Sequence, residues 1–150
     1  MAKTPRIVAI VLFVSGGILV IAGVVTYFIV GNELSDEHIT VAEDADRFAG
    51  EDVDGPFTAY SQASIIQEHA LEIGGGKTYA ELPRDDPTRE TVMDASFLRA
   101  SLFTSIVAFG VAVLAAGLGL LFILVGLAIL AFDRRIPAEV RPVEPAPTAV

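Results

Sequence analysis

The sequence lacks cysteine and contains only two histidines, His38 and His69. The absence of cysteine excludes disulfide bonds, thiolate catalysis and cysteine-ligated metal centres. Two histidines do not supply both the ligands of an iron centre and a separate acid–base group, and neither lies in a recognisable nucleophile motif. We therefore expect no catalytic residue, no cofactor and no resident metal, and a domain held together by packing rather than by cross-links.

Charged residues are missing from two long stretches, residues 7–31 and 100–132. Each stretch exceeds the roughly 20 apolar residues that cross about 30 Å of hydrocarbon. The first stretch is also longer than the roughly 7–15-residue core of a cleavable signal peptide, which favours an uncleaved anchor. The pattern predicts an all-α membrane protein in which two antiparallel transmembrane helices contact the lipid bilayer.

The charges are unevenly distributed over the rest of the chain. Residues 32–99 carry sixteen acidic and five basic side chains, and the remaining bases lie in residues 1–6 and 133–150. Because short basic flanks stay in the cytoplasm, we expect a cytoplasmic N-terminus (1–6), a proline-rich cytoplasmic tail (133–150) and an acidic extracytoplasmic domain (32–99) at the plasma membrane. An acidic surface excludes nucleic acid as a partner, since phosphate binding needs clustered cations.

Small residues recur at every seventh position in both apolar stretches. The positions are Ala9, Gly16 and Gly23 in the first stretch, and Ser105, Ala112, Gly119 and Gly126 in the second. Seven residues are close to two helical turns, so each set lies on one helix face, and membrane helices associate where small residues let their backbones approach. We predict that these faces pack the two spans as a hairpin or hold two copies together. The alternative is that glycine and alanine are simply common in membrane helices.

The acidic segment between the spans predicts a small, mainly helical insertion, preceded by a short strand at residues 38–41. A helix is expected over about residues 56–73, with Asp54 as N-cap, Pro56 in its first turn and the glycines at 74–76 as its stop. An apolar stripe at helical spacing marks its buried face: Ala59, Ala63, Ile66, Ala70 and Ile73.

A second helix is expected from Pro87, capped by Asp86, and nothing interrupts helical character until Phe132. At 1.5 Å per residue this single helix measures roughly 69 Å, more than twice the hydrocarbon thickness. The second span is therefore part of one long helix whose first turns project from the membrane. Met93, Phe97 and Ala100 are expected to face the shorter helix.

Two motifs fall short of known binding sites. The run from Gly74 to Thr78 ends like a phosphate-binding loop, but Leu71 occupies the position of the required first glycine and the run follows a helix. The acidic stretch before residue 55 does not form an EF-hand, because Gly50 and Ser61 occupy the first and twelfth loop positions. A flexible turn and a solvated acidic loop are expected, and weak binding of a hard cation by that loop stays open.

Several segments carry a resemblance to known proteins. They are Thr58-Ala59-Tyr60, His69-Ala70-Leu71-Glu72, Thr78-Tyr79-Ala80-Glu81-Leu82 and residues 95–105. Over about residues 57–130 the chain resembles a group of small actinobacterial two-span membrane proteins of unknown function, whose members often carry the label "aromatic ring-opening dioxygenase". The resemblance brings no catalytic residues, and we expect the label not to apply to a chain without a recognised set of iron ligands.

Two functional hypotheses follow. The first is a non-catalytic membrane protein, an accessory subunit or envelope scaffold whose outer helical pair contacts a membrane or envelope protein or a second copy of the chain. The second is an extracytoplasmic sensor that binds a cation or small ligand through the acidic loop. The first predicts a protein partner, and the second predicts saturable stabilisation by a cation or metabolite.

Overall fold

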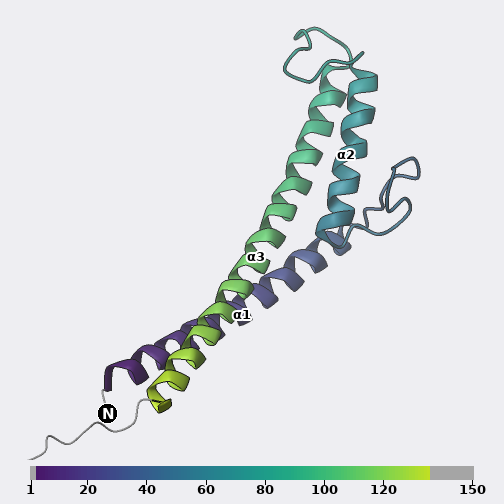
Figure 1. Cartoon of the computed structure of the whole chain (residues 1–150). Helices are drawn as coiled ribbons and strands as arrows, with labels where there is room; N and C mark the ends of the chain where they lie inside the picture. Colours follow the sequence, from purple (N-terminus) through teal and green to yellow (C-terminus); the bar gives the residue numbers. More distant parts are fainter. Residues whose placement is uncertain (1–2, 136–150) are drawn as a thin grey trace, which may run out of the picture.

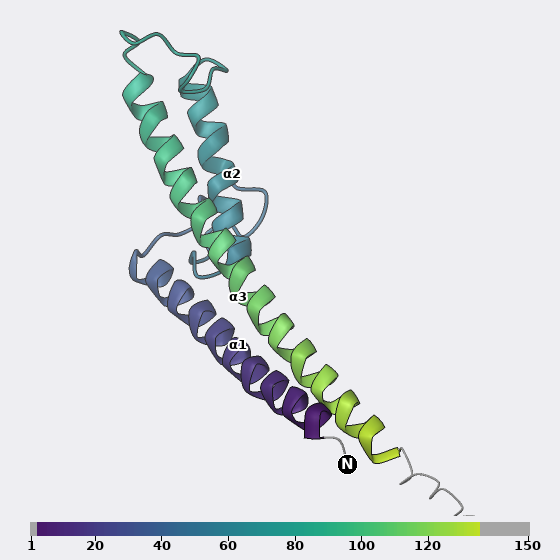
Figure 2. The same cartoon turned by 90° about the vertical axis from the view of Figure 1, so that its left-hand side faces the viewer.

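The computed structural model describes residues 3–135, which form three helices: α1 (Lys3–Asp36), α2 (Pro56–Ile73) and α3 (Arg89–Arg135). The predicted cytoplasmic ends at residues 1–2 and 136–150 lie outside the described residues. α1 and α3 lie side by side in opposite directions, and α3 continues past the end of α1 to pair with α2 (Figures 1 and 2). The all-α prediction is confirmed for the described part of the chain.

Within residues 3–135, two helices are long and apolar enough to cross a membrane: Thr4–Asp36, within α1, and Arg89–Phe132, within α3. Their large side chains point outward on several sides, and Ile21, Leu114 and Leu124 are 66%, 61% and 61% exposed. A helix that is apolar all round belongs either in a protein core or in a bilayer, and these side chains are not in a core. Both helices extend beyond the predicted spans, because no residue that stops a helix follows either uncharged stretch directly.

α2 has the predicted bounds, but its N-cap differs from the prediction. The cap residue is Gly55, and the Thr58 hydroxyl accepts a hydrogen bond from the Gly55 N–H and donates one to the Gly55 carbonyl, each at 3.2 Å. Asp54 as the cap is therefore wrong by one residue, because the threonine side chain already satisfies this end. At the other end Gly75 and Gly76 adopt positive φ values of 60° and 81°, which stop the helix as expected.

α3 begins at Arg89 rather than at the predicted Pro87. Asp86 still organises this end, because its carboxylate accepts hydrogen bonds from the Thr88 N–H at 2.9 Å and from the Thr88 hydroxyl at 2.6 Å. This local turn holds Pro87 outside the helix. From Arg89 the helix runs for 47 residues without a break, in agreement with one long helix that continues into the second apolar stretch.

The segment between α1 and α2 folds back on itself beside the end of α1. The predicted strand at residues 38–41 is wrong: Thr40 and Asp52 form an isolated antiparallel bridge, within which the Val41 N–H donates to the Glu51 carbonyl at 2.8 Å. Val41 and Val53 are 1% and 0% exposed. These two valines fill the junction where all three helices meet, in one cluster with Leu34, Ala59, Ala63, Leu102 and Phe109.

The outer part of α3 faces α2 with different residues from those expected. Val92 is 2% exposed and packs with Ala70 and Leu82, whereas Phe97 is 65% exposed. The prediction is therefore wrong for Phe97 and Ala100, which are exposed, whereas Met93 is half-buried. The contact with α2 is made by Val92 and by Arg99, which donates to the Ala63 carbonyl. On α2 the predicted stripe is buried at Ala59, Ala63 and Ala70, half-buried at Ile66 and exposed at Ile73.

Candidate functional site

The repeated small residues lie in the contact between α1 and α3. Ala9, Gly16 and Gly23 on α1 are buried, and so are Ala112, Gly119 and Gly126 on α3. Gly16 faces Gly119, Gly23 faces Ala112, and Ala9 faces Gly126. A step of seven residues up one helix therefore matches a step of seven down the other, which is the register of an antiparallel pair.

The two backbones approach too closely for side chains at three of these positions. A Cβ atom added to Gly16 would lie 2.6 Å from the Gly119 carbonyl oxygen, and one added to Gly119 would lie 2.5 Å from the Gly16 carbonyl oxygen. A Cβ on Gly23 would lie 2.5 Å from the Ala112 carbonyl oxygen. At Gly126 the corresponding distance, to the Ala9 carbonyl oxygen, is 3.3 Å, so this end of the contact is looser.

Ser105 and the other glycines of the spans differ from these positions. Ser105 is only half-buried and its hydroxyl donates to the Ser101 carbonyl of its own helix at 3.4 Å, so it makes no polar bond to α1. Gly17, Gly110 and Gly117 have nothing within 4 Å of an added Cβ. The spacing thus separates glycines that lie in the contact from glycines that face outward.

Arginine side chains connect the outer elements. The Arg99 Nε–H donates to the Ala63 carbonyl of α2 at 3.2 Å, and the guanidinium lies 5.5 Å from the Phe103 ring centroid. Arg89 donates to the carbonyl oxygens of Tyr79 and Leu82 and stacks 4.2 Å from the Tyr79 ring centroid. Arg89 therefore holds the loop between α2 and α3 against the start of α3.

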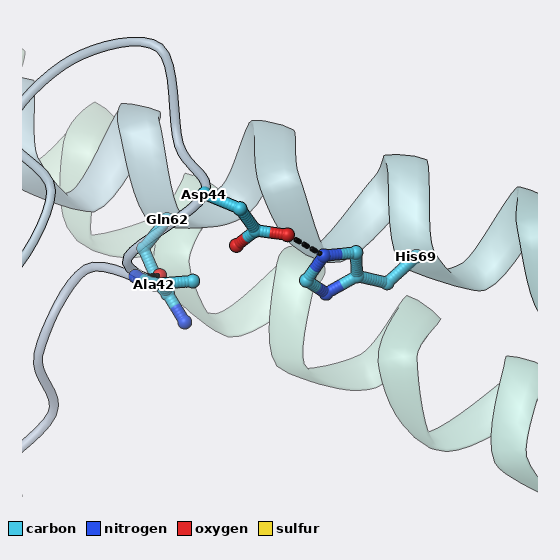
Figure 3. Close-up of polar contacts among 4 residues, drawn as sticks. All are labelled: Ala42, Asp44, Gln62 and His69. Atoms are coloured by element: carbon cyan, nitrogen blue, oxygen red, sulfur yellow. Dashed lines mark hydrogen bonds and ion pairs between the residues drawn. The ribbon is translucent and has the colours of Figure 1, made fainter.

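Three polar contacts attach the acidic loop to α2. The Ser61 hydroxyl donates to the Arg47 carbonyl at 2.6 Å, and the other two contacts lie among the residues drawn in Figure 3. His69 Nε2 lies 2.7 Å from the Asp44 carboxylate, and the Gln62 side-chain oxygen accepts a hydrogen bond from the Ala42 N–H at 2.9 Å. The hydrogen bond from His69 lowers the pKa of Asp44 below its usual value. Among the described residues no group of three or more His, Asp or Glu side chains converges as a metal site. His69 contacts the single carboxylate of Asp44, and His38 is not part of this contact.

A hollow of about 280 Å³ lies between the acidic loop and α2, and the sequence analysis does not predict it. Three aromatic side chains line it, Phe48, Phe57 and Tyr60, together with Arg47 and Glu68. Phe57 is 74% exposed and Tyr60 57%, and the Tyr60 ring meets Phe103 of α3 edge-on, with centroids 6.1 Å apart. The sequence signal for this hollow is a pair of aromatic side chains, Phe57 and Tyr60, on the first turns of α2 and outside its apolar stripe.

Comparisons of the chain with family models, curated proteins and solved structures find no match.

Proposed function

We propose that this chain is a non-catalytic, two-span membrane protein whose outer helical pair contacts another protein of the membrane or envelope. Residues 7–31 of α1 and residues 100–132 of α3 form an antiparallel hairpin in the bilayer, and residues 32–99 form an extracytoplasmic domain. The resemblance to small actinobacterial membrane proteins stays a prediction and names no activity.

The observation that carries this proposal is an apolar patch on the outer part of α3. Phe97 and Leu98 are 65% and 56% exposed, whereas Val92, which packs against Ala70 of α2, is 2% exposed. They belong to the same unbroken helix as the second apolar stretch, so a partner bound at the patch would be linked rigidly to the second span. Exposed apolar side chains rimmed by charge are typical of protein contacts.

The charge of this region indicates the chemistry of the partner. Residues 32–99 carry sixteen acids and five bases, and Asp94 and Glu90 lie one and two helical turns before the patch. A protein that presents apolar side chains among basic ones would complement it. The second copy of this acidic chain is less suited, because equal charges would face each other.

A photo-crosslinking amino acid placed at Phe97 or Leu98 tests the contact in native membranes. We expect one discrete adduct from each position, with a yield that falls as salt rises because the contact is partly electrostatic. The same amino acid at Glu72, an exposed position at the far end of α2, is the matched control and should give none. The absence of an adduct at both positions, or the same adducts from Glu72, would contradict the proposal. An adduct of twice the chain mass would assign the patch to self-association.

The proposed topology is tested separately with single cysteines in this cysteine-free chain. A membrane-impermeant maleimide added to intact cells should label Glu72→Cys and spare Ala149→Cys, since short basic flanks stay inside. The opposite labelling pattern would overturn the orientation, and labelling of both would show that the chain does not separate two compartments.

A second candidate function, an extracytoplasmic ligand sensor, is favoured by the hollow beside the acidic loop. Its lining combines aromatic rings with two carboxylates, Asp46 and Glu68, and one cation, Arg47, and this aromatic, acid-rich combination suits an organic cation better than a metal ion. Saturable thermal stabilisation by tetramethylammonium, lost in Tyr60→Ala and kept in Phe97→Ala, would support it.

A further inference from the structure

Each of the three helices carries exposed aromatic side chains near the junction cluster. Phe57 and Tyr60 project from the first turns of α2, Phe103 from α3 and Phe28 from α1. Phe28 is 65% exposed and Phe103 is 36% exposed, so all four rings reach the surface of the chain. None of the four is part of the buried junction cluster.

The helix register gives the level of these rings along the hairpin. The glycine contacts place Gly23 opposite Ala112, and the same register continued by one heptad places Val30 opposite Ser105. The uncharged stretch of α1 ends at Gly31, followed at once by Asn32 and Glu33. The outer limit of the apolar slab therefore lies near residue 31 of α1 and residue 104 of α3.

The beginning of α2 lies at that same level. Tyr60 touches Phe103, and the backbone carbonyl of Asp54, next to the start of α2, lies 3.1 Å from where a Cβ of Gly31 would be. In both views the lower end of α2 lies at about the height of the end of α1, and α2 rises from there beside α3, away from the hairpin (Figures 1 and 2). Phe57 and Tyr60 thus stand on the outer domain but at the edge of the apolar slab.

We infer that Phe57 and Tyr60, together with Phe103 and Phe28, insert into the headgroup layer of the bilayer and seat the outer domain on the membrane. Aromatic side chains favour this layer because one end of the ring system meets acyl chains and the other meets water. The occupant is lipid because the patch continues directly into the outward-facing apolar surface of the hairpin, with Val107 63% and Val111 58% exposed below Phe103. Arg99, whose guanidinium lies over Phe103, is the last charged residue before this surface and can remain at the phosphate level.

The inference rests on the proposed hairpin in the bilayer, and the chain allows the two to be tested apart. It contains no tryptophan, so one introduced tryptophan is the only indole in the protein. Three variants define the depth: Leu114→Trp in the apolar stretch, Phe57→Trp at the start of α2 and Ile73→Trp at its end. Phe57 and Ile73 lie on one helix, roughly 24 Å apart along its axis.

Each variant is reconstituted in phosphatidylcholine vesicles that carry either a headgroup spin label or bromine in the middle of the acyl chain. We expect Leu114→Trp to be quenched most by the brominated lipid, and Phe57→Trp to emit at shorter wavelength than Ile73→Trp and to be quenched most by the headgroup label. Ile73→Trp should be quenched by neither. Tyr60→Trp should behave like Phe57→Trp.

The outcomes separate the two ideas. Quenching of Leu114→Trp, with Phe57→Trp and Tyr60→Trp as insensitive as Ile73→Trp, overturns the seating of the domain and leaves the hairpin intact. Failure of the brominated lipid to quench Leu114→Trp overturns the hairpin as well. A blue-shifted Phe57→Trp that no lipid probe quenches assigns the patch to protein contact, and dilution of protein in lipid then tests for a second copy.

Discussion

α3 pairs with two helices along its length, and the two contacts use different chemistry. Against α1 the two backbones touch through Gly16, Gly23 and Gly119, and large side chains point outward. Against α2 the contact consists of alanines and Val92, supplemented by the arginine bond from Arg99 to the Ala63 carbonyl. A single helix thus changes its mode of packing where its charged residues begin.

The difference follows from the solvent expected around each part. In lipid the burial of an apolar side chain gains little, so helices associate by close backbone approach over small residues. In water the burial of apolar side chains supplies the driving force, and buried carbonyls and amides are paired with polar side chains. The arginine and glutamine bonds lie outside the two uncharged stretches, within residues 32–99.

The largest effect is expected from one methyl group added to the glycine contact between α1 and α3. Gly119→Ala places a Cβ 2.5 Å from the Gly16 carbonyl oxygen and 2.8 Å from the Val20 nitrogen, which are backbone atoms that have to move. We expect a loss of about 1–3 kcal/mol in the free energy of unfolding. Denaturation of the reconstituted protein by increasing detergent fraction, followed by circular dichroism, measures it.

Gly117→Ala is the matched control, two residues away on the same helix. An added Cβ there meets nothing within 4 Å, so the change should be neutral or stabilise the helix by up to about 1 kcal/mol through helix propensity. Equal effects of Gly117→Ala and Gly119→Ala would mean that glycine content, rather than the heptad spacing, determines how α1 and α3 pack.

The sequence predicted those parts that depend on local or strictly periodic signals. Residues 56–73 were predicted as a helix because a proline begins it and three glycines end it, and both signals act within a few residues. The heptad of small residues needed only the helical repeat to be placed on one face. The length of α3 followed from the absence of any helix-breaking residue after Pro87.

The parts that could not be predicted depend on contacts between distant segments. Phe97 was assigned to the α2 contact because it is apolar, but the face that meets α2 is set by how Leu82 and Ala70 pack on Val92. Gly55 rather than Asp54 is the N-cap of α2, because the hydroxyl of Thr58 bonds the Gly55 backbone. The hollow depends on a loop with no periodic pattern, in which Phe48 adopts a positive φ of 60° that its residue type does not suggest.

A smaller effect is expected from Arg89→Lys in the outer contact. A lysine cannot donate to both the Tyr79 and Leu82 carbonyls while stacking on the Tyr79 ring, so the loop between α2 and α3 loses a fixed support. We expect a cost of about 1–2 kcal/mol and faster amide exchange at Glu81 and Leu82, whose N–H groups donate within this loop.

The control for this variant is Arg84→Lys, an exposed position in the same loop. Hydrogen exchange followed by mass spectrometry should show no change for it, and neither variant should alter the exchange of α1. Faster exchange in α1 on Arg89→Lys would contradict the expectation that α3 packs against α1 and against α2 independently.

The smallest expected effect lies in the pH dependence of the outer part alone. The Thr88 hydroxyl and N–H donate to Asp86 and hold the pKa of that carboxyl below its usual value of 3.8. A carboxyl whose pKa is lowered by folding stabilises the folded state above its unfolded pKa, and this contribution disappears as the pH falls through the folded pKa. Thr88→Val removes the hydroxyl and keeps the N–H, so it should destabilise the outer part at neutral pH. The difference in stability between Thr88→Val and the unaltered protein should shrink below pH 3.8.

Thr91→Val, at an exposed position on the next turn, should show no such pH dependence. Thermal unfolding at a series of pH values checks both variants, and a Thr88→Val difference that stayed constant into acid would show that the hydroxyl acts on the start of α3 without acting through the Asp86 charge.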